Sequence, residues 1–303
     1  MRFFAIRVWL LTALLATGAR SVAQSPPAPS SETQKGFTEI ESFQGTVYSS
    51  ERVLKLDSAL GWDFNSHFGV FAGVPLYFAH ISGSTTTTGT TTTTTPGSSH
   101  DGIGNAYLGF AFRAPNPALD YASALTVAAP TGDTKKGLSS GRANVDWDNR
   151  LEHAFSRFTP FFEGGLGNTV PDSTLVTRSF TSLGLVAHLQ EGGGYQLVRH
   201  FSINGAAYEI VPFGNQKIFS KLVAAGQAAK GSGKNGRIFE TAAEASGNGL
   251  TRENGFSAWV GFEPTPLWDL QIGYTRSVTF ALNSFAFNLR MNVASLLRSR
   301  KSS

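Results

Sequence analysis

Five polar residues alternate along one stretch of the sequence, and their side chains could select ions or polar solutes. The residues that share this parity are Asn144, Asp146, Asp148, Arg150 and Glu152. Successive side chains of a strand point to opposite faces, so a strand over 143–155 would carry all five on one face. Charged groups that line a pore choose solutes by the sign of their charge. The alternative is a mutually paired interior network that stiffens a narrow barrel and conducts nothing.

Three charged residues outside that stretch fall on the same kind of polar face. Arg113 ends the alternating segment 103–113, Glu163 lies in 159–167, and Arg290 lies in 284–293. On neighbouring strands they would be partners across a lumen. The candidate lumen or selectivity residues are therefore Arg113, Asn144, Asp146, Asp148, Arg150, Glu152, Glu163 and Arg290.

A histidine and a serine at positions 200 and 202 raise the question of an enzyme. His200 and Ser202 share one strand face, as a Ser–His hydrolase would need. No carboxylate is evident nearby to orient the histidine, so chance is the better account of this pair. The sequence shows no metal-ligand spacing and no phosphate-binding loop. We expect no catalytic residue, no metal and no cofactor.

Strands must hold these side chains, and alternation recurs along the whole chain. In 53–64, for example, Leu54 and Trp62 fall on one face while Lys55 and Asp57 fall on the other. A soluble sheet can also alternate in this way. The repetition of such segments behind a secretion signal, without helical periods between them, favours strands with one face on lipid and the other on a wet lumen.

The connections between the segments alternate in length. Short turns fall near residues 65, 115, 157, 199 and 265, and longer connections fall between them. Outer-membrane barrels have short periplasmic turns, long external loops and an even number of strands. Eleven segments alternate clearly, and the weaker segment 37–48 is the one available as a twelfth. The predicted fold is all-β: a transmembrane antiparallel up-and-down β-barrel of about twelve strands.

The sequence divides into a leader, a barrel and a tail. Residues 1–23 have the charged start, short apolar run and small-residue cleavage site of a signal peptide. We expect a flexible periplasmic leader at 24–36, the barrel at 37–293 and a basic tail at 294–303. Two barrel connections stand out. The threonine-rich stretch 82–100 is predicted as an exposed loop, and 212–253 as a long external loop in which 218–229 has a weak helical period.

Composition excludes several classes of protein. Charged residues make up 15% of the chain, against about a quarter in a typical soluble domain. Removal of Arg2, Arg7 and Arg20 with the signal peptide lowers the formal charge from +4 to +1, so nothing favours a nucleic-acid partner. The chain has no cysteine, which excludes disulfides, thiolate metal sites and a lipoprotein anchor.

Three stretches together resemble one known family. They are DGIGNAYLGFAFR at 101–113, AAPTGDTKKGLSSG at 128–141 and EGGGYQLVRHFSINGAAYEIVPFGNQK at 191–217. The chain is similar, over about residues 50–293, to outer-membrane transporters of the meta-pathway phenol-degradation family. The most specific piece is the corner Pro130-Thr131-Gly132-Asp133, while Asn105 stands where an acidic residue is common. The resemblance implies an outer-membrane barrel that passes hydrophobic or aromatic compounds, and it supplies no site residue.

The sequence therefore predicts a barrel of the bacterial outer membrane for passive uptake of small, aromatic or hydrophobic solutes. The alternative is a closed structural or surface-binding barrel without transport. Loop lysines could bridge lipopolysaccharide phosphates or could simply be solvated. They include Lys135, Lys136, Lys217, Lys221, Lys230 and Lys234. The expected partners are a small solute and outer-membrane lipid, and the sequence gives no oligomeric state.

Overall fold

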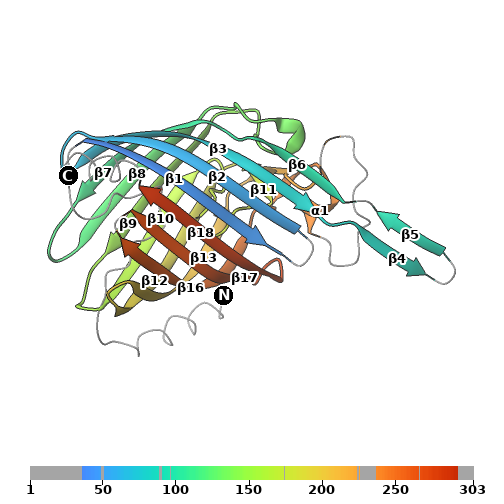
Figure 1. The fold of residues 1–303 in the computed structure, drawn as a ribbon. Coiled ribbons are helices and arrows are strands. Elements are labelled where there is room, and N and C mark those ends of the chain that lie inside the picture. The colour runs from blue at the N-terminus through green and yellow to red at the C-terminus, as the bar shows by residue number, and fades with distance from the viewer. Residues whose placement is uncertain are drawn as a thin grey trace, which may run out of the picture.

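The computed structural model describes residues 36–48, 51–88, 91–95, 97–173, 175–223, 225, 237–265 and 267–292. The signal peptide predicted at 1–23, the leader up to residue 35 and the tail predicted at 294–303 lie outside these residues. Most described elements are strands, and each barrel strand runs antiparallel to its neighbours (Figure 1). Among the described residues, no helix combines the length and the apolar character needed to cross a bilayer.

The main sheet closes on itself because β1 pairs with β2 on one side and with β18 on the other. β6 and β7 both pair with β3 and together occupy one strand position of the barrel wall, which we call a stave. The described sheet is therefore a closed barrel of twelve staves, as predicted. The weak segment 37–48 is β1, which the ladder to β18 holds in place. The barrel strands are β1 (Gly36–Val47), β2 (Glu51–Asp63), β3 (Phe68–Ile81), β6 (Ser98–Ile103), β7 (Tyr107–Ala114), β8 (Asp120–Ala128), β9 (Asn144–Glu152), β10 (Phe158–Gly167), β12 (Val186–Val198), β13 (Phe201–Pro212), β16 (Glu253–Thr265), β17 (Trp268–Ser277) and β18 (Leu282–Asn292).

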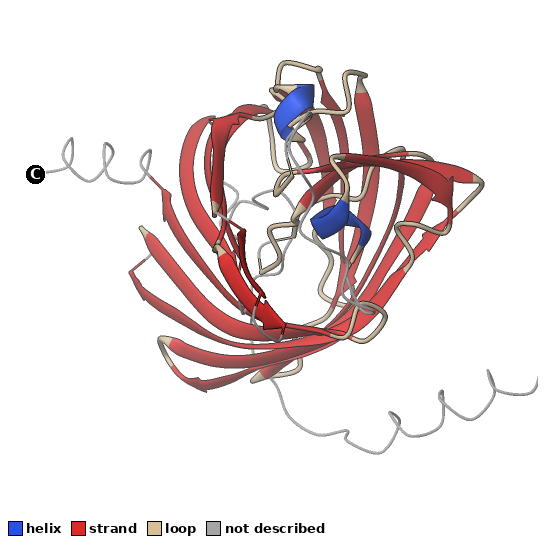
Figure 2. Ribbon diagram, turned by 90° about the vertical axis from the view of Figure 1, so that its right-hand side faces the viewer, coloured by secondary structure: helices blue, strands red, loops and turns tan. Residues whose placement is uncertain are grey.

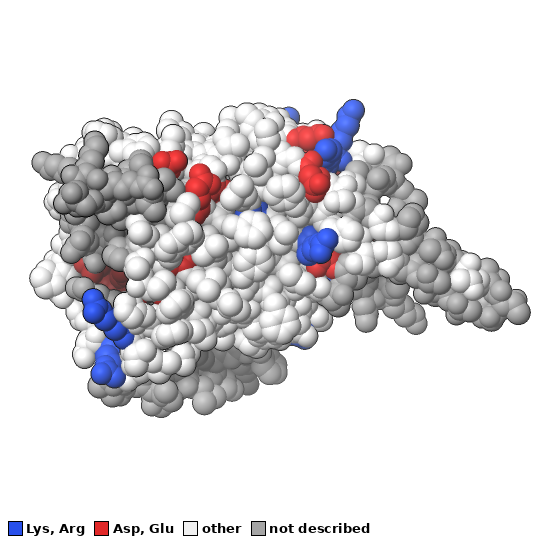
Figure 3. All heavy atoms as spheres, viewed as in Figure 1, with Lys and Arg blue, Asp and Glu red and all other residues white. Residues whose placement is uncertain are grey.

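The two faces of the barrel wall differ in polarity, as the alternation predicts. Trp147 and Phe110 point outward with 49% and 44% of their surface exposed, whereas Asp148 and Arg150 point inward and are buried. Most charged atoms visible in Figure 3 lie toward the two ends of the barrel. Apolar groups exposed around a closed wall are unfavourable in water and favourable against hydrocarbon. The wall is therefore built to stand in a membrane.

The long connections gather at one end of the barrel, which we name the loop end, and the short ones gather at the opposite turn end (Figure 1). At the loop end, β4 (Ser84–Thr88) and β5 (Thr91–Thr95) form a hairpin that projects beyond the wall. The stretch 82–100, predicted as an exposed loop, therefore contains a hairpin, and β6 also begins within it at Ser98. Threonine is β-branched and favours extended backbone, a preference that the low-complexity argument left out.

One stave is interrupted between β6 and β7, and a neighbouring corner fills the gap. The Thr131 hydroxyl accepts a hydrogen bond from Ala106 N at 2.8 Å and donates one to Gly104 O at 3.0 Å. These bonds satisfy backbone groups that the broken ladder would leave unpaired. No residue with a side chain fits at position 132 in place of glycine, because an added Cβ would lie 2.6 Å from Leu138 O. The corner that carries the family resemblance therefore has a structural task in this barrel.

The remaining elements fold into the mouth at the loop end, inside the ring of strands (Figure 2). β11 (Phe180–Leu183), β14 (Asn215–Ser220) and β15 (Glu244–Asn248) form a small antiparallel sheet beside α1 (Ile238–Thr241) and the 3-10 helix η1 (Thr134–Lys136). Leu138, Phe180, Ile218, Leu222 and Phe239 from this region pack with Val53 and Tyr77 of the wall in one buried cluster. The helix expected over 218–229 is wrong at 218–220, which belong to β14.

Candidate functional site

Three of the predicted lumen residues form one ion network centred on the buried Arg150. Arg150 Nη1 lies 3.1 Å from Glu163 Oε2, and Arg150 Nε lies 3.0 Å from Glu152 Oε2. The register of β9 and β10 places Arg150 directly opposite Glu163. The guanidinium also stacks on Phe161, with 3.9 Å between its central carbon and the ring centroid. The single cation of Arg150 is shared by two carboxylates, and the three side chains fill part of the lumen.

Asp146 and Asp148 face a histidine that our sequence analysis missed. His188 Nε2 lies 2.9 Å from Asp146 Oδ1, and His188 Nδ1 lies 3.9 Å from Asp148 Oδ1. β10 stands between their strands, but its Gly165 is paired with both Asp148 and His188 and has no side chain to block the imidazole. The inward parity of His188 on an alternating strand was the signal available in the sequence. The contact between His188 and the two aspartates across β10 could be predicted only from the register of the three strands.

The other predicted lumen residues have partners of their own. Arg113 Nη1 lies 2.9 Å from Asp63 Oδ1, and Arg290 Nη2 lies 2.9 Å from Asp269 Oδ2. Asn144 accepts a hydrogen bond at 3.1 Å from a serine hydroxyl of the preceding loop. The structure thus brings the candidates of β9 and β10 together and places Arg113 and Arg290 on separate strands.

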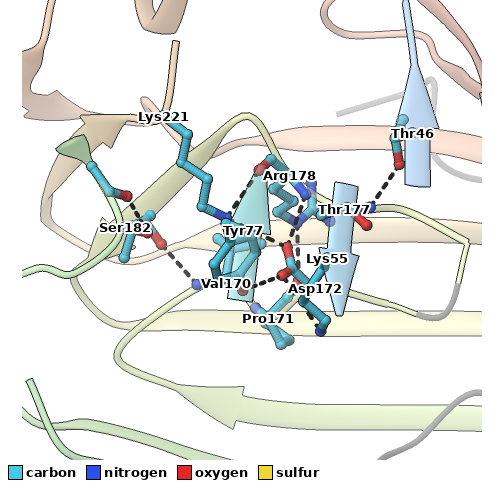
Figure 4. A network of polar contacts seen from close by, with 12 residues as sticks. Thr46, Lys55, Tyr77, Val170, Pro171, Asp172, Thr177, Arg178, Ser182 and Lys221 are labelled. Atoms are coloured by element: carbon cyan, nitrogen blue, oxygen red, sulfur yellow. Dashed lines mark hydrogen bonds and ion pairs between the residues drawn. The ribbon is translucent and has the colours of Figure 1, made fainter. Parts of the chain in front are cut away.

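The segment 168–182, one of the longer connections between barrel strands, enters the lumen and carries a buried carboxylate. Asp172 Oδ2 accepts a hydrogen bond from Tyr77 Oη at 2.7 Å, and Asp172 Oδ1 accepts one from Arg178 N at 2.8 Å. Lys55 Nζ lies 3.7 Å from Asp172 Oδ2, and Lys221 Nζ lies 3.9 Å from Asp172 Oδ1. Figure 4 shows these groups converging on Asp172 from the wall, from the segment and from the insertion after β14.

The charges around Asp172 set its ionisation. Burial alone would raise the pKa of Asp172, but Lys221, Lys55, the Arg178 N–H and Tyr77 outweigh burial and hold this pKa at about 2. Burial lowers the pKa of Lys221 to about 8 despite the attraction of Asp172, and Lys55 adds to the decrease. At neutral pH the pair is therefore ionic. The sequence places Lys221 among the predicted external loop lysines, but its side chain is buried.

Two further polar contacts hold the segment against the wall. Thr177 N donates a hydrogen bond to Thr46 Oγ1 of β1 at 2.7 Å. The Arg178 guanidinium pairs with the Glu253 carboxylate, which also accepts a hydrogen bond from Tyr208. Both Arg178 and Glu253 are buried, so each needs the other to compensate its charge.

An apolar contact fixes the segment deeper in the lumen. Leu175 is 1% exposed and lies in a buried cluster with Phe161, Ala206, Trp259 and Ala286 of the wall. These partners come from β10, β13, β16 and β18, on different sides of the barrel. A side chain buried in a cluster with residues of four wall strands narrows the lumen at this level.

Two cavities remain beside the segment. The larger has a volume of about 270 Å³, and the side chains around it mix aromatic and charged groups: Phe71, Tyr77, Tyr107, Lys55, Asp57 and Lys221. The smaller has a volume of about 80 Å³ and is mainly acidic, with Asp146, Asp148, Glu163 and His188 in its wall. Residues 170–173 line both cavities. We name these four residues the partition.

His200 and Ser202 have other partners in the structure. His200 Nδ1 lies 2.8 Å from Glu263 O, and Ser202 Oγ accepts a hydrogen bond from Asn204 Nδ2 at 3.0 Å. This is not the hydroxyl–imidazole arrangement of a serine hydrolase. Within the described part of the chain, no group of three histidine or acidic side chains is placed to hold a metal ion.

Comparison with known proteins supports the fold at low sequence identity. No family model matches the chain, and no curated protein matches its sequence. An outer membrane channel from Pseudomonas putida is 14% identical with a TM-score of 0.52, covering 89% of this chain and 97% of that one. The NanC porin is 9% identical with a TM-score of 0.41 (84% of this chain, 98% of that one), and the CymD monoaromatic hydrocarbon channel is 7% identical with a TM-score of 0.39 (90% and 94%). The last two likenesses are too loose to carry an argument, and membership of the phenol-degradation family stays a prediction. The chain is a closed twelve-strand barrel of the bacterial outer membrane, with the fold of a channel.

Proposed function

We propose that this barrel lets small solutes cross the outer membrane passively. The observation that carries the proposal is the 270 Å³ cavity inside a closed wall that faces lipid. The sequence shows no nucleotide-binding loop to couple transport to energy, so movement would follow the solute gradient. The likeness to an outer membrane channel and the resemblance found in the sequence support the same class of function.

The lining of the cavity favours solutes with one aromatic ring and polar substituents. A cavity of about 150 Å³ accommodates benzene, so 270 Å³ accommodates one substituted ring. Tyr107 and Phe71 pack edge to face on the wall, and Tyr107 Oη donates a hydrogen bond to Asp57 at 2.9 Å. Ring faces and paired charges side by side suit a molecule that carries both characters.

Swelling of liposomes that contain the purified barrel tests this proposal. Phenylalanine is a suitable probe, because its charged groups slow its passage through lipid while its size matches the cavity. We expect phenylalanine to enter faster than in protein-free liposomes and maltotriose to remain excluded. Equal swelling with and without the barrel, for every small solute, would contradict the proposal.

A closed barrel that acts through its loops is the second candidate. It is favoured by the inward segment 168–182, whose contacts with several staves narrow the lumen. Deleting the projecting hairpin at 84–95 separates the two ideas, because that hairpin lies beyond the wall (Figure 1). Solute entry should survive the deletion under the first proposal. Binding to lipopolysaccharide or to cells should be lost under the second.

A further inference from the structure

The partition stands between two chambers of different character. On one side lies the larger cavity, with lysines and carboxylates in balance around aromatic rings. On the other side lies the smaller, acidic cavity. The larger cavity lies against β18, β1–β3 and β7–β9, and the smaller lies against β9, β10, β12, β13 and β16. The partition therefore divides the cross-section of the lumen, and its position decides whether the two cavities join into one wider passage.

One carboxylate connects the partition to three other parts of the barrel. Asp172 is the partition's charged member, and it contacts Tyr77 of β3, Lys55 of β2 and Lys221 after β14. The two lysines reach it only at 3.7 and 3.9 Å, longer than a direct charge-assisted hydrogen bond. One side chain thus ties the segment to the wall and to the insertion at once.

Loss of the Asp172 charge would leave its cationic partners poorly compensated. The side chains of Lys55 and Lys221 are 10% and 3% exposed, so water screens them little. Lys55 keeps Asp57, whose Oδ2 lies 3.4 Å from its Nζ, and Lys221 keeps a hydrogen bond to Arg178 O. Removing one partner of a buried charge pair is strongly destabilising, because the other charge stays buried.

We infer that Asp172 is the positioning residue that holds the segment 168–182 across the lumen, so that loss of its carboxylate joins the two chambers and raises permeation. This inference rests on the proposed function for its effect on permeation. The release of the segment on loss of the Asp172 carboxylate does not depend on the proposed function.

Thiol labelling tests the release directly. The chain has no cysteine, so a Thr177→Cys variant carries one thiol at a position that is 1% exposed and bonded to β1. With Asp172→Asn added, we expect a water-soluble maleimide to label this thiol about tenfold faster, equal to about 1.4 kcal/mol in the opening equilibrium. The matched control is Asp101→Asn, which removes an exposed carboxylate bonded to Ser99 at the loop end. Equal labelling rates in the Asp172→Asn and Asp101→Asn backgrounds would overturn the inference, whether or not the barrel conducts.

Single-channel recording in planar bilayers tests the permeation half. We expect Asp172→Asn to open more often than the wild-type barrel by a similar factor, with Asp101→Asn unchanged. A Thr46→Cys/Thr177→Cys disulfide added to Asp172→Asn should return the current to the wild-type level, and a reductant should restore the increase. A disulfide that forms without lowering the current would overturn the inference. Faster labelling with no current through any variant would instead contradict the proposed function, while the inference that Asp172 holds the segment 168–182 would stand.

Discussion

Arg150 pairs with carboxylates on two strands of the wall. It serves two carboxylates and one aromatic ring, and its side chain is 5% exposed. Sequence parity predicted that Arg150 and Glu163 point inward. It could not predict that they pair, because the pairing depends on the register of β9 against β10.

Arg150→Met should destabilise the barrel by about 3 kcal/mol, because Glu163 would remain buried without its cation. Guanidinium unfolding in detergent micelles, followed by tryptophan fluorescence, measures the loss. The control is Lys217→Met, whose pair with Glu244 is about half exposed and should contribute less than about 1 kcal/mol. Equal losses in the two variants would mean that the interior is as well solvated as the surface.

Acid should release the segment 168–182. Asp172 has a pKa of about 2 in the folded barrel against 3.8 in water, so its ionised form stabilises the closed segment by about 2 kcal/mol. Because the folded pKa is depressed, this stabilisation is present above pH 3.8 and is lost as the pH falls through about 2. The facing groups Lys55, Lys221, Tyr77 and Arg178 stay protonated in that range.

We therefore expect channel opening to rise between pH 4 and pH 2 in the wild-type barrel and to stay flat in Asp172→Asn. Asp57→Asn controls for the other carboxylate near Lys55. Opening that rises with acid to the same extent in Asp172→Asn would assign the effect to another group.

The broken stave is the clearest case in which an element depends on a distant corner. β6 and β7 share the partner β3, but the residues between them leave the ladder and are bonded by Thr131. The sequence marked the corner 130–133 as specific without giving a reason. The physical reason is that two backbone groups need a hydroxyl that both donates and accepts.

Thr131→Val should lower the free energy of unfolding by about 1 kcal/mol, because it keeps the shape and removes both hydrogen bonds. Thr131→Ser keeps the hydroxyl and should restore most of the stability. Urea unfolding of the three proteins in micelles provides the comparison. A serine variant as weak as the valine variant would show that the methyl group, and not the hydroxyl, holds the corner.

Elements without a hydrophobic period were the hardest to predict. Eleven barrel strands could be predicted from their alternation, whereas the weak segment 37–48, which is β1, was assigned only because the even strand count required a twelfth strand. The segment 168–182 has no period, since its backbone is fixed by single contacts from Asp172, Leu175 and Thr177. Such contacts join residues up to 131 positions apart, and no local pattern encodes them.

At the scale of the whole molecule, the outer face of the barrel wall is suited to contact with hydrocarbon. Phe110→Arg should cost about 2 to 4 kcal/mol of folding stability in lipid vesicles, as expected for a cation on the lipid face of a barrel. Leu119→Arg is the matched control. The two residues are equally exposed, at 44% and 45%, but Leu119 lies in a short turn outside the strands. If both variants folded as well as the wild type, the outer face would not be a lipid face.

The architecture of the barrel could be predicted from the sequence, but the contents of its lumen could not. Polarity alternation, turn lengths and the even strand count together predicted a closed twelve-strand barrel, which the structure has. They left open whether the charged side chains line a pore or form a mutually paired network, and they placed no loop inside the lumen. The structure instead shows a segment inside it and two cavities, because buried charges such as Asp172 draw loops inward when the wall supplies partners.

Single-channel current with the partition removed tests the central claim most directly. Replacing residues 169–181 with a short glycine–serine linker removes Asp172, Leu175 and Thr177 while leaving the barrel strands intact. We predict small or rare openings for the wild-type barrel and a steady, larger current for the shortened one. A shortened barrel that is folded and inserted in the bilayer yet carries no current would contradict the account of this lumen as a route for solutes.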